Sequence, residues 1–138
     1  MEVRLESTDG PGRQAEVWVD GTLLVVMDEY SRPGEQAAPG LLTYAKFVYM
    51  TEQAFSWADA AAANRSERRL LEPLGSWRYA GYGRVVQIMP VVIDFGLLCM
   101  KDANWTNDEK LVGKFVRVPI DRLSLTHQES NRWPEDLR

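Results

Sequence analysis

Asp94 is a lone carboxylate within an apolar stretch, Val91-Val92-Ile93-Asp94-Phe95. A carboxylate on a strand needs a hydrogen-bond or charge partner if it is buried. In the mouth of a pocket it can serve as a general acid or base. The sequence favours a structural ion pair, with Arg84 or Arg117 on a neighbouring strand, over catalysis. Asp94 is therefore the one catalytic candidate, and it belongs to an alternative in which the protein is a small-substrate enzyme.

A second segment, SWRYAGYGR at residues 76–84, mixes aromatic and basic side chains. Aromatic faces that stack bases, beside guanidinium groups that hold phosphates, are typical of single-strand binding grooves. The alternative is ordinary strand alternation, with the aromatic side chains in a core and the charges in water. The candidate residues for a ligand or nucleic acid are Trp77, Arg78, Tyr79, Tyr82 and Arg84.

The overall charge counts against a nucleic-acid partner. The formal net charge is −4 at pH 7, whereas non-specific nucleic-acid binders usually carry a strong positive field. Residues 65–84 hold five basic and two acidic side chains, so a local basic patch is still compatible with the sequence. Nucleic acid is therefore an unfavoured partner that the composition does not exclude.

Metal and cofactor chemistry has little support. One histidine, His127, and one cysteine, Cys99, cannot build a zinc site without carboxylates. No acidic cluster has the spacing of a calcium loop. Cys99 follows Leu97-Leu98, which predicts a buried thiol with a raised pKa. We expect no metal and no cofactor.

The stretch EVWVDGTLLVVMDE at residues 16–29 predicts a β-hairpin. Asp20-Gly21 favours a type I′ turn, which pairs Trp18 with Leu23. One face of this hairpin then collects five apolar side chains and is expected to face the core: Ala15, Val17, Val19, Leu24 and Val26. The other face carries Trp18, Leu23 and Val25, which either the 52–63 helix or a second molecule must cover. These three residues are the candidate protein interface.

The remaining elements follow from periodicity and glycine positions. Strands are predicted near residues 2–6, 43–50, 77–89, 91–100 and 114–120, with loops at 31–40 and 101–110. An alanine-rich stripe predicts the principal helix over residues 52–63, followed by a short helical piece at 67–71. Gly81 and Gly83, inside a strand, indicate bulges or barrel corners.

These elements predict a β-rich α+β fold of about seven strands. We expect an antiparallel sheet, or a small closed or partly open barrel, with the 52–63 helix packed on it. The order of elements is similar in topology to an oligonucleotide/oligosaccharide-binding barrel, although no residue motif supports that alternative. The predicted organisation is one domain over residues 1–123 and a polar tail over 124–138, in which Trp133 is the residue able to dock.

Length and targeting signals complete the sequence-based picture. The 138 residues suit one ordinary domain, and the longest apolar run is far too short to span a membrane. The first residues have no apolar signal-peptide core, so we expect a cytoplasmic protein without a membrane partner. The favoured function is a non-enzymatic binding or interaction domain that self-associates, or docks on a protein partner, through a β face.

Overall fold

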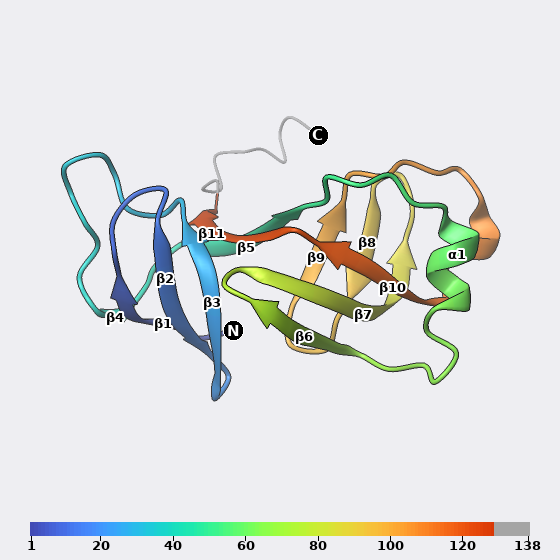
Figure 1. Ribbon diagram of the computed structural model, residues 1–138, viewed down its shortest axis with the longest axis horizontal. Coiled ribbons are helices and arrows are strands. Elements are labelled where there is room, and N and C mark those ends of the chain that lie inside the picture. Colours follow the sequence, from blue (N-terminus) through green and yellow to red (C-terminus); the bar gives the residue numbers. More distant parts are fainter. Residues whose placement is uncertain (129–138) are drawn as a thin grey trace. The chain divides into compact units, whose positions relative to one another are not determined.

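A computed structural model describes residues 1–128, and Trp133 with its predicted docking lies outside this range. The described residues form eleven strands, one α-helix and one short 3-10 helix, η1 (Glu109–Leu111). The strands form two sheets (Figure 1). The prediction of a β-rich α+β fold is therefore confirmed.

The first sheet has the strand order β4-β1-β2-β3-β11-β5. Its strands are β1 (Val3–Thr8), β2 (Gln14–Val19), β3 (Thr22–Asp28), β4 (Gly40–Leu41), β5 (Ala45–Met50) and β11 (Arg122–His127). The β3–β11 pair is parallel, whereas β1 pairs with β2 and β4, and β2 pairs with β3, in the antiparallel sense.

The β2–β3 hairpin has the predicted register. Trp18 is paired with Leu23, and Asp20 and Gly21 have the positive φ angles, 46° and 83°, of a type I′ turn. The five side chains expected on the inner face are all buried: Ala15, Val17, Val19, Leu24 and Val26. Local turn chemistry and the period of two therefore fix this element.

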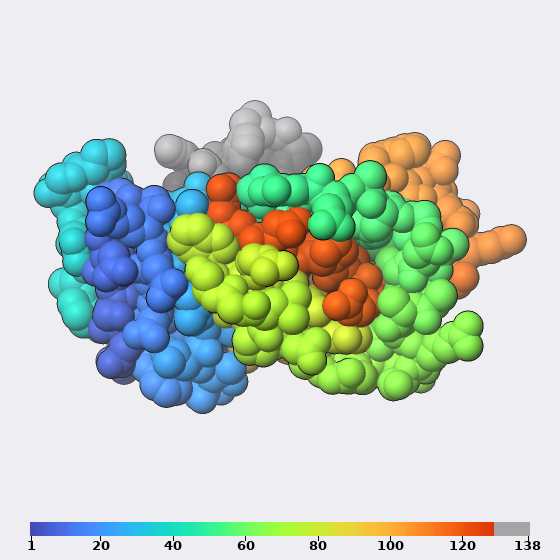
Figure 2. Space-filling model, viewed as in Figure 1, coloured from blue at the N-terminus to red at the C-terminus, as the bar shows by residue number. Residues whose placement is uncertain are grey.

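The second sheet is centred on the long strand β7. Its strands are β6 (Leu70–Gly75), β7 (Arg78–Gln87), β8 (Val91–Asp94), β9 (Cys99–Asp102) and β10 (Phe115–Ile120). Strand β10 pairs with residues 79–84 of β7. Strand β6 pairs with the first part of β7, up to Tyr82, and β8 pairs with its last part, from Arg84 on. Strand β9 pairs with β8. Residues of β10 and of β6–β7 lie side by side in the space-filling view (Figure 2).

Gly81 and Gly83 allow close packing across β7. A Cβ atom on Gly81 would lie 2.6 Å from the Phe95 ring, and one on Gly83 would lie 2.6 Å from the Asp94 carbonyl oxygen. The register shift of the β7–β8 pair falls between Val85 and Gln87 instead. These glycines therefore mark a close approach of neighbouring strands, and the predicted bulge lies a few residues further along.

The helix α1 (Trp57–Ala62) is shorter than the predicted 52–63. Ser56 caps it by accepting a hydrogen bond from the Asp59 N–H, which sets its start. Helix α1 packs against β10 (Figure 1). The helical piece predicted at 67–71 is wrong, because Leu70 begins β6 and pairs with Tyr82. Strand pairing overrides the weak local helix preference there.

Within residues 1–128 neither sheet closes, so the closed form of the predicted barrel is not formed. Closure requires the two edge strands of one sheet to pair with each other. The first sheet instead ends at the two-residue strand β4 and at β5, and β6 to β10 form a separate sheet.

The chain divides into two compact units. Among the described residues, the first comprises residues 1–47 and 124–128, and the second comprises residues 48–123. Strand β11 continues to His127, inside the segment expected to begin a polar tail, and the His127 ring stacks on Tyr30 with centroids 4.0 Å apart. Among residues 1–128, no helix is long and apolar enough to cross a membrane.

Candidate functional site

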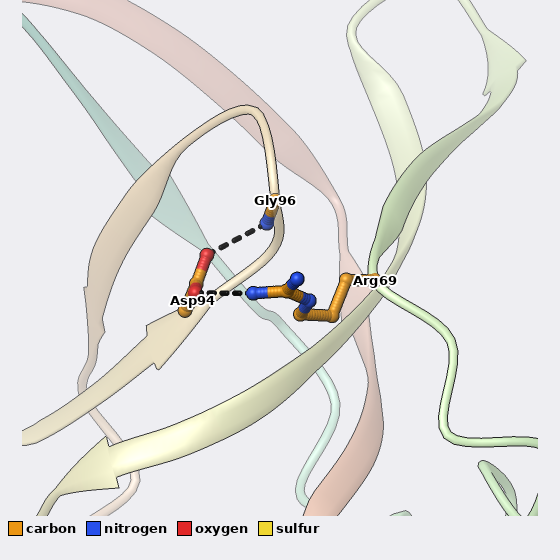
Figure 3. Close-up of polar contacts among 3 residues, drawn as sticks. All are labelled: Arg69, Asp94 and Gly96. Carbon is orange, nitrogen blue, oxygen red and sulfur yellow. Dashed lines mark hydrogen bonds and ion pairs between the residues drawn. The ribbon is translucent and has the colours of Figure 1, made fainter.

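Asp94 lies at the end of β8 and stabilises the turn that follows. One carboxylate oxygen accepts a hydrogen bond from Arg69 Nη1 at 2.9 Å, and the other accepts the Gly96 N–H at 2.8 Å (Figure 3). The predicted partners Arg84 and Arg117 do not form this ion pair, although Arg84 is opposite Asp94 in the strand register. The geometry favours a structural role, because the carboxylate pairs with Arg69 and accepts a hydrogen bond from the turn.

Cys99 is exposed rather than buried, which corrects the prediction. Strand β9 begins at this residue and directs Met100 inward, so the alternation places the thiol outside. Desolvation, with a smaller contribution from the charge of Asp94, still raises the pKa of the thiol. Cys99 is therefore accessible but poorly ionised.

The structure separates the residues of the predicted aromatic-basic segment. Tyr79 is buried, and Trp77 lies half-buried in the turn before β7. Arg78, Tyr82 and Arg84 occupy the alternate positions of the strand, of which the two arginines are exposed. Of the three aromatic side chains in the segment, Tyr82 is therefore the one that shares a strand face with the arginines.

Two arginines that are distant in sequence join Tyr82. The Arg68 guanidinium lies 4.5 Å from the centre of the tyrosine ring, and that of Arg117 lies 5.6 Å away. Arg117 Nε also donates a hydrogen bond to the Tyr82 hydroxyl at 3.1 Å. Arg84, on the same strand face, makes no ion pair with any residue of the described chain. We call Arg68, Tyr82, Arg84 and Arg117 the cationic face.

The predicted protein interface lies on the outer side of the first sheet. Leu41, Arg4, Trp18 and Leu23 are successive cross-strand partners over β4, β1, β2 and β3, so their side chains share one face. The relative exposures are 58% for Leu41, 37% for Trp18 and 40% for Leu23. Val25 lies further along the same face and is half-buried. The predicted residues are therefore brought together, and Leu41 joins them.

Charged side chains lie within and beside this row of residues. Trp18 Nε1 donates a hydrogen bond to Glu6 Oε1 at 2.9 Å, and Glu16 accepts one from the Ser7 hydroxyl. Arg4 makes no ion pair within residues 1–128. The Trp18 face is defined here by Arg4, Glu6, Glu16, Trp18, Leu23 and Leu41.

A buried carboxylate in the first unit, Asp28, has a structural environment. The Thr8 hydroxyl donates to one of its oxygens, and the backbone N–H groups of Tyr30 and Ser31 donate to the other. Desolvation alone would raise the pKa of Asp28, but these hydrogen bonds outweigh it and lower the pKa. Both oxygens of the Asp28 carboxylate therefore accept hydrogen bonds within the protein, which is typical of a structural role.

A pocket in the second unit was not predicted from the sequence. Asp102 is buried at the end of β9, and the Tyr49 hydroxyl donates a hydrogen bond to it. The cavity beside this pair has a volume of about 330 Å³ and is lined by Tyr49 and by residues 51–55 and 102–104. Burial raises the pKa of Asp102 and, together with the Asp102 charge, that of Tyr49. A concave site with perturbed ionisable groups is a candidate for ligand binding.

Asn104 holds the walls of this pocket together. Its side-chain Nδ2 donates to the Phe55 carbonyl oxygen at 3.0 Å, and its own carbonyl oxygen accepts from Trp57 Nε1 at 3.2 Å. The Asn104 N–H donates to Asp102 at 2.8 Å. Sequence alone gave little sign of the site, because Tyr49 and Asp102 are far apart in the chain and adjoin only in the fold.

Metal chemistry finds no support in the described residues, which contain no group of three or more histidine, cysteine, aspartate or glutamate side chains placed to hold an ion. Comparisons of the chain with family models, with curated proteins and with solved structures find no match.

Proposed function

We propose that the protein is a non-enzymatic interaction module that self-associates through the Trp18 face. The observation that supports this most is the unbroken cross-strand row of Leu41, Arg4, Trp18 and Leu23 on the outer side of the first sheet. Adjacent exposed apolar side chains, such as Trp18 and Leu23, with polar groups around them are typical of protein interaction surfaces.

The charges on the Trp18 face favour a second copy of the chain as the partner. In a two-fold symmetric dimer the same patch occurs on both sides, so it has to be complementary to itself. The Trp18 face carries the cation Arg4, which has no ion-pair partner within residues 1–128, beside the anions Glu6 and Glu16. It therefore offers each copy both signs of charge. A partner of one strong charge would leave part of this rim unmatched.

Sedimentation equilibrium of the full chain over a range of concentrations tests this proposal. We expect a species of twice the monomer mass whose fraction rises with protein concentration. A monomer at every concentration would contradict self-association, and a stable complex with a different protein would assign the Trp18 face to that partner instead.

A second candidate function is the binding of single-stranded nucleic acid by the cationic face. It is supported by the clustering of Arg68 and Arg117 at Tyr82, with the exposed Arg84 on the same face of β7. Guanidinium groups hold phosphates, and an aromatic ring can stack a base. The excess of acidic residues in the whole chain, with a net charge of −4, weighs against this candidate.

Fluorescence anisotropy with a labelled oligothymidine tests the second candidate. We expect binding that weakens as the salt concentration rises from about 50 to 200 mM. Arg84→Ala should weaken binding, whereas Arg13→Ala, at an exposed position of the first unit, should not. Equal affinities for both variants, or binding that is insensitive to salt, would refute a role of the cationic face.

A further inference from the structure

The pocket beside Tyr49 and Asp102 is acidic and partly aromatic. All its lining residues belong to the second unit, so the site is complete within that unit. Its lining includes two carboxyl groups, those of Asp102 and Glu52, the ring of Phe55, and no lysine or arginine. The carboxyl groups that line the pocket therefore favour a cationic ligand.

Asp102 retains capacity to accept further hydrogen bonds. The residue is only 6% exposed and occupies an inward position of β9. A carboxylate offers about four acceptor positions. The Tyr49 hydroxyl and the Asn104 N–H use two of them. Because no cationic side chain of the described residues pairs with Asp102, a bound cation would supply both the missing charge and the missing donors.

We propose that this pocket binds a small organic cation whose primary ammonium group donates hydrogen bonds to Asp102 while its apolar body lies against Phe55. An ammonium group brings three donors on a compact charge, which suits a carboxylate that already has two partners. A hard metal cation suits the pocket less well, because it requires six or more oxygen ligands. The described residues contain no group of three or more histidine, cysteine, aspartate or glutamate side chains placed to hold a metal ion.

Nuclear magnetic resonance titration with benzylamine tests the proposal, with benzyl alcohol as a neutral probe of nearly the same shape. We expect benzylamine to shift the backbone amide signals of Ala54 and Ala103, which line the pocket. Benzyl alcohol should bind at least about tenfold more weakly, because it lacks the charge-assisted hydrogen bonds. Equal binding of the two probes, or no shift with benzylamine, would overturn the proposal.

Substitutions test how much the carboxylate contributes to binding, separately from the rest of the pocket. Asp102→Asn should weaken benzylamine binding at least about tenfold and leave benzyl alcohol unaffected. If Asp102→Asn does not fold, Glu52→Gln at an exposed position replaces it and should weaken benzylamine binding by a smaller factor. Tyr49→Phe should retain benzylamine binding, because it removes a competing donor from Asp102. Unchanged benzylamine affinity in the folded carboxylate variant would contradict the assignment.

Discussion

Trp18 and Leu23 are directly opposed across the β2–β3 ladder, and both side chains lie on the outer side of the first sheet. The hydrogen bond from the Trp18 indole to Glu6 restricts the ring before any partner arrives. A side chain that is already ordered loses less entropy when it becomes part of an interface. This pair is therefore the expected centre of the proposed contact, since tryptophan is enriched among the residues that dominate binding energy.

The close approach at Gly83 predicts a large loss of stability on substitution. Gly83→Ala would place a methyl group 2.6 Å from the Asp94 carbonyl oxygen and from a side-chain carbon of Ile93. Because a backbone atom is one of the two obstacles, we expect the free energy of unfolding to fall by about 2 kcal/mol or more. Chemical denaturation measures this change. Val86→Ala, at an exposed position of the same strand, is the control and should change it by less than about 1 kcal/mol.

The buried carboxylate of Asp28 predicts a pH-dependent contribution to stability. Its pKa is lowered in the fold, so its contribution is present above the unfolded-state value of 3.8 and is lost as the pH falls through the folded-state pKa. We expect Asp28→Asn to destabilise the protein by about 1–2 kcal/mol at pH 7. The difference from the wild type should shrink in acid.

Urea denaturation at pH 7 and in acid measures how much Asp28→Asn changes the free energy of unfolding. The neighbouring exposed carboxylate Asp9 provides the control, since Asp9→Asn should change stability by less than about 0.5 kcal/mol at pH 7. A loss in Asp28→Asn that is equally large in acid would contradict the assigned role of the ionised carboxylate.

The reactivity of the Cys99 thiol is expected to depend on the charge of Asp94, its cross-strand neighbour. That charge contributes to the raised pKa of the thiol, after desolvation. Asp94→Asn should therefore increase the rate at which a disulfide reagent modifies Cys99 at mildly alkaline pH, by less than about tenfold because desolvation remains. Since Cys99 is the only cysteine, the kinetics have one source. Equal rates for the folded wild type and variant would show that Asp94 does not influence the thiol.

The elements predicted most accurately are those with local signals. The β2–β3 register follows from Asp20-Gly21 and from the alternation on both sides of it, which are visible within fourteen residues. Strand β11 was not predicted, although Leu123 and Leu125 alternate with polar residues, and its partner β3 is remote in sequence. Its pairing is therefore invisible to a local analysis.

The candidate sites show the same division between local and distant information. The apolar outer row at Trp18 could be predicted, because strand alternation assigns its face. Arg68 and Arg117 at Tyr82 could not, since they come from separate segments that the second sheet brings together. Asp102 occupies an inward position that only the register of β9 with β8 reveals. Sequence patterns thus predict the faces of single strands and the register of a tight hairpin, but not partners that are remote in sequence.

The most direct test of the central claim compares two leucine substitutions in sedimentation equilibrium. Leu23 and Leu74 are exposed strand residues of similar exposure, 40% and 46%, in the first and second units respectively. We predict that Leu23→Lys raises the dimer dissociation constant at least about tenfold, because it places a charge directly opposite Trp18. Leu74→Lys should leave the constant unchanged. A wild-type protein that stays monomeric, or a dimer that Leu23→Lys does not weaken, would contradict self-association through this face.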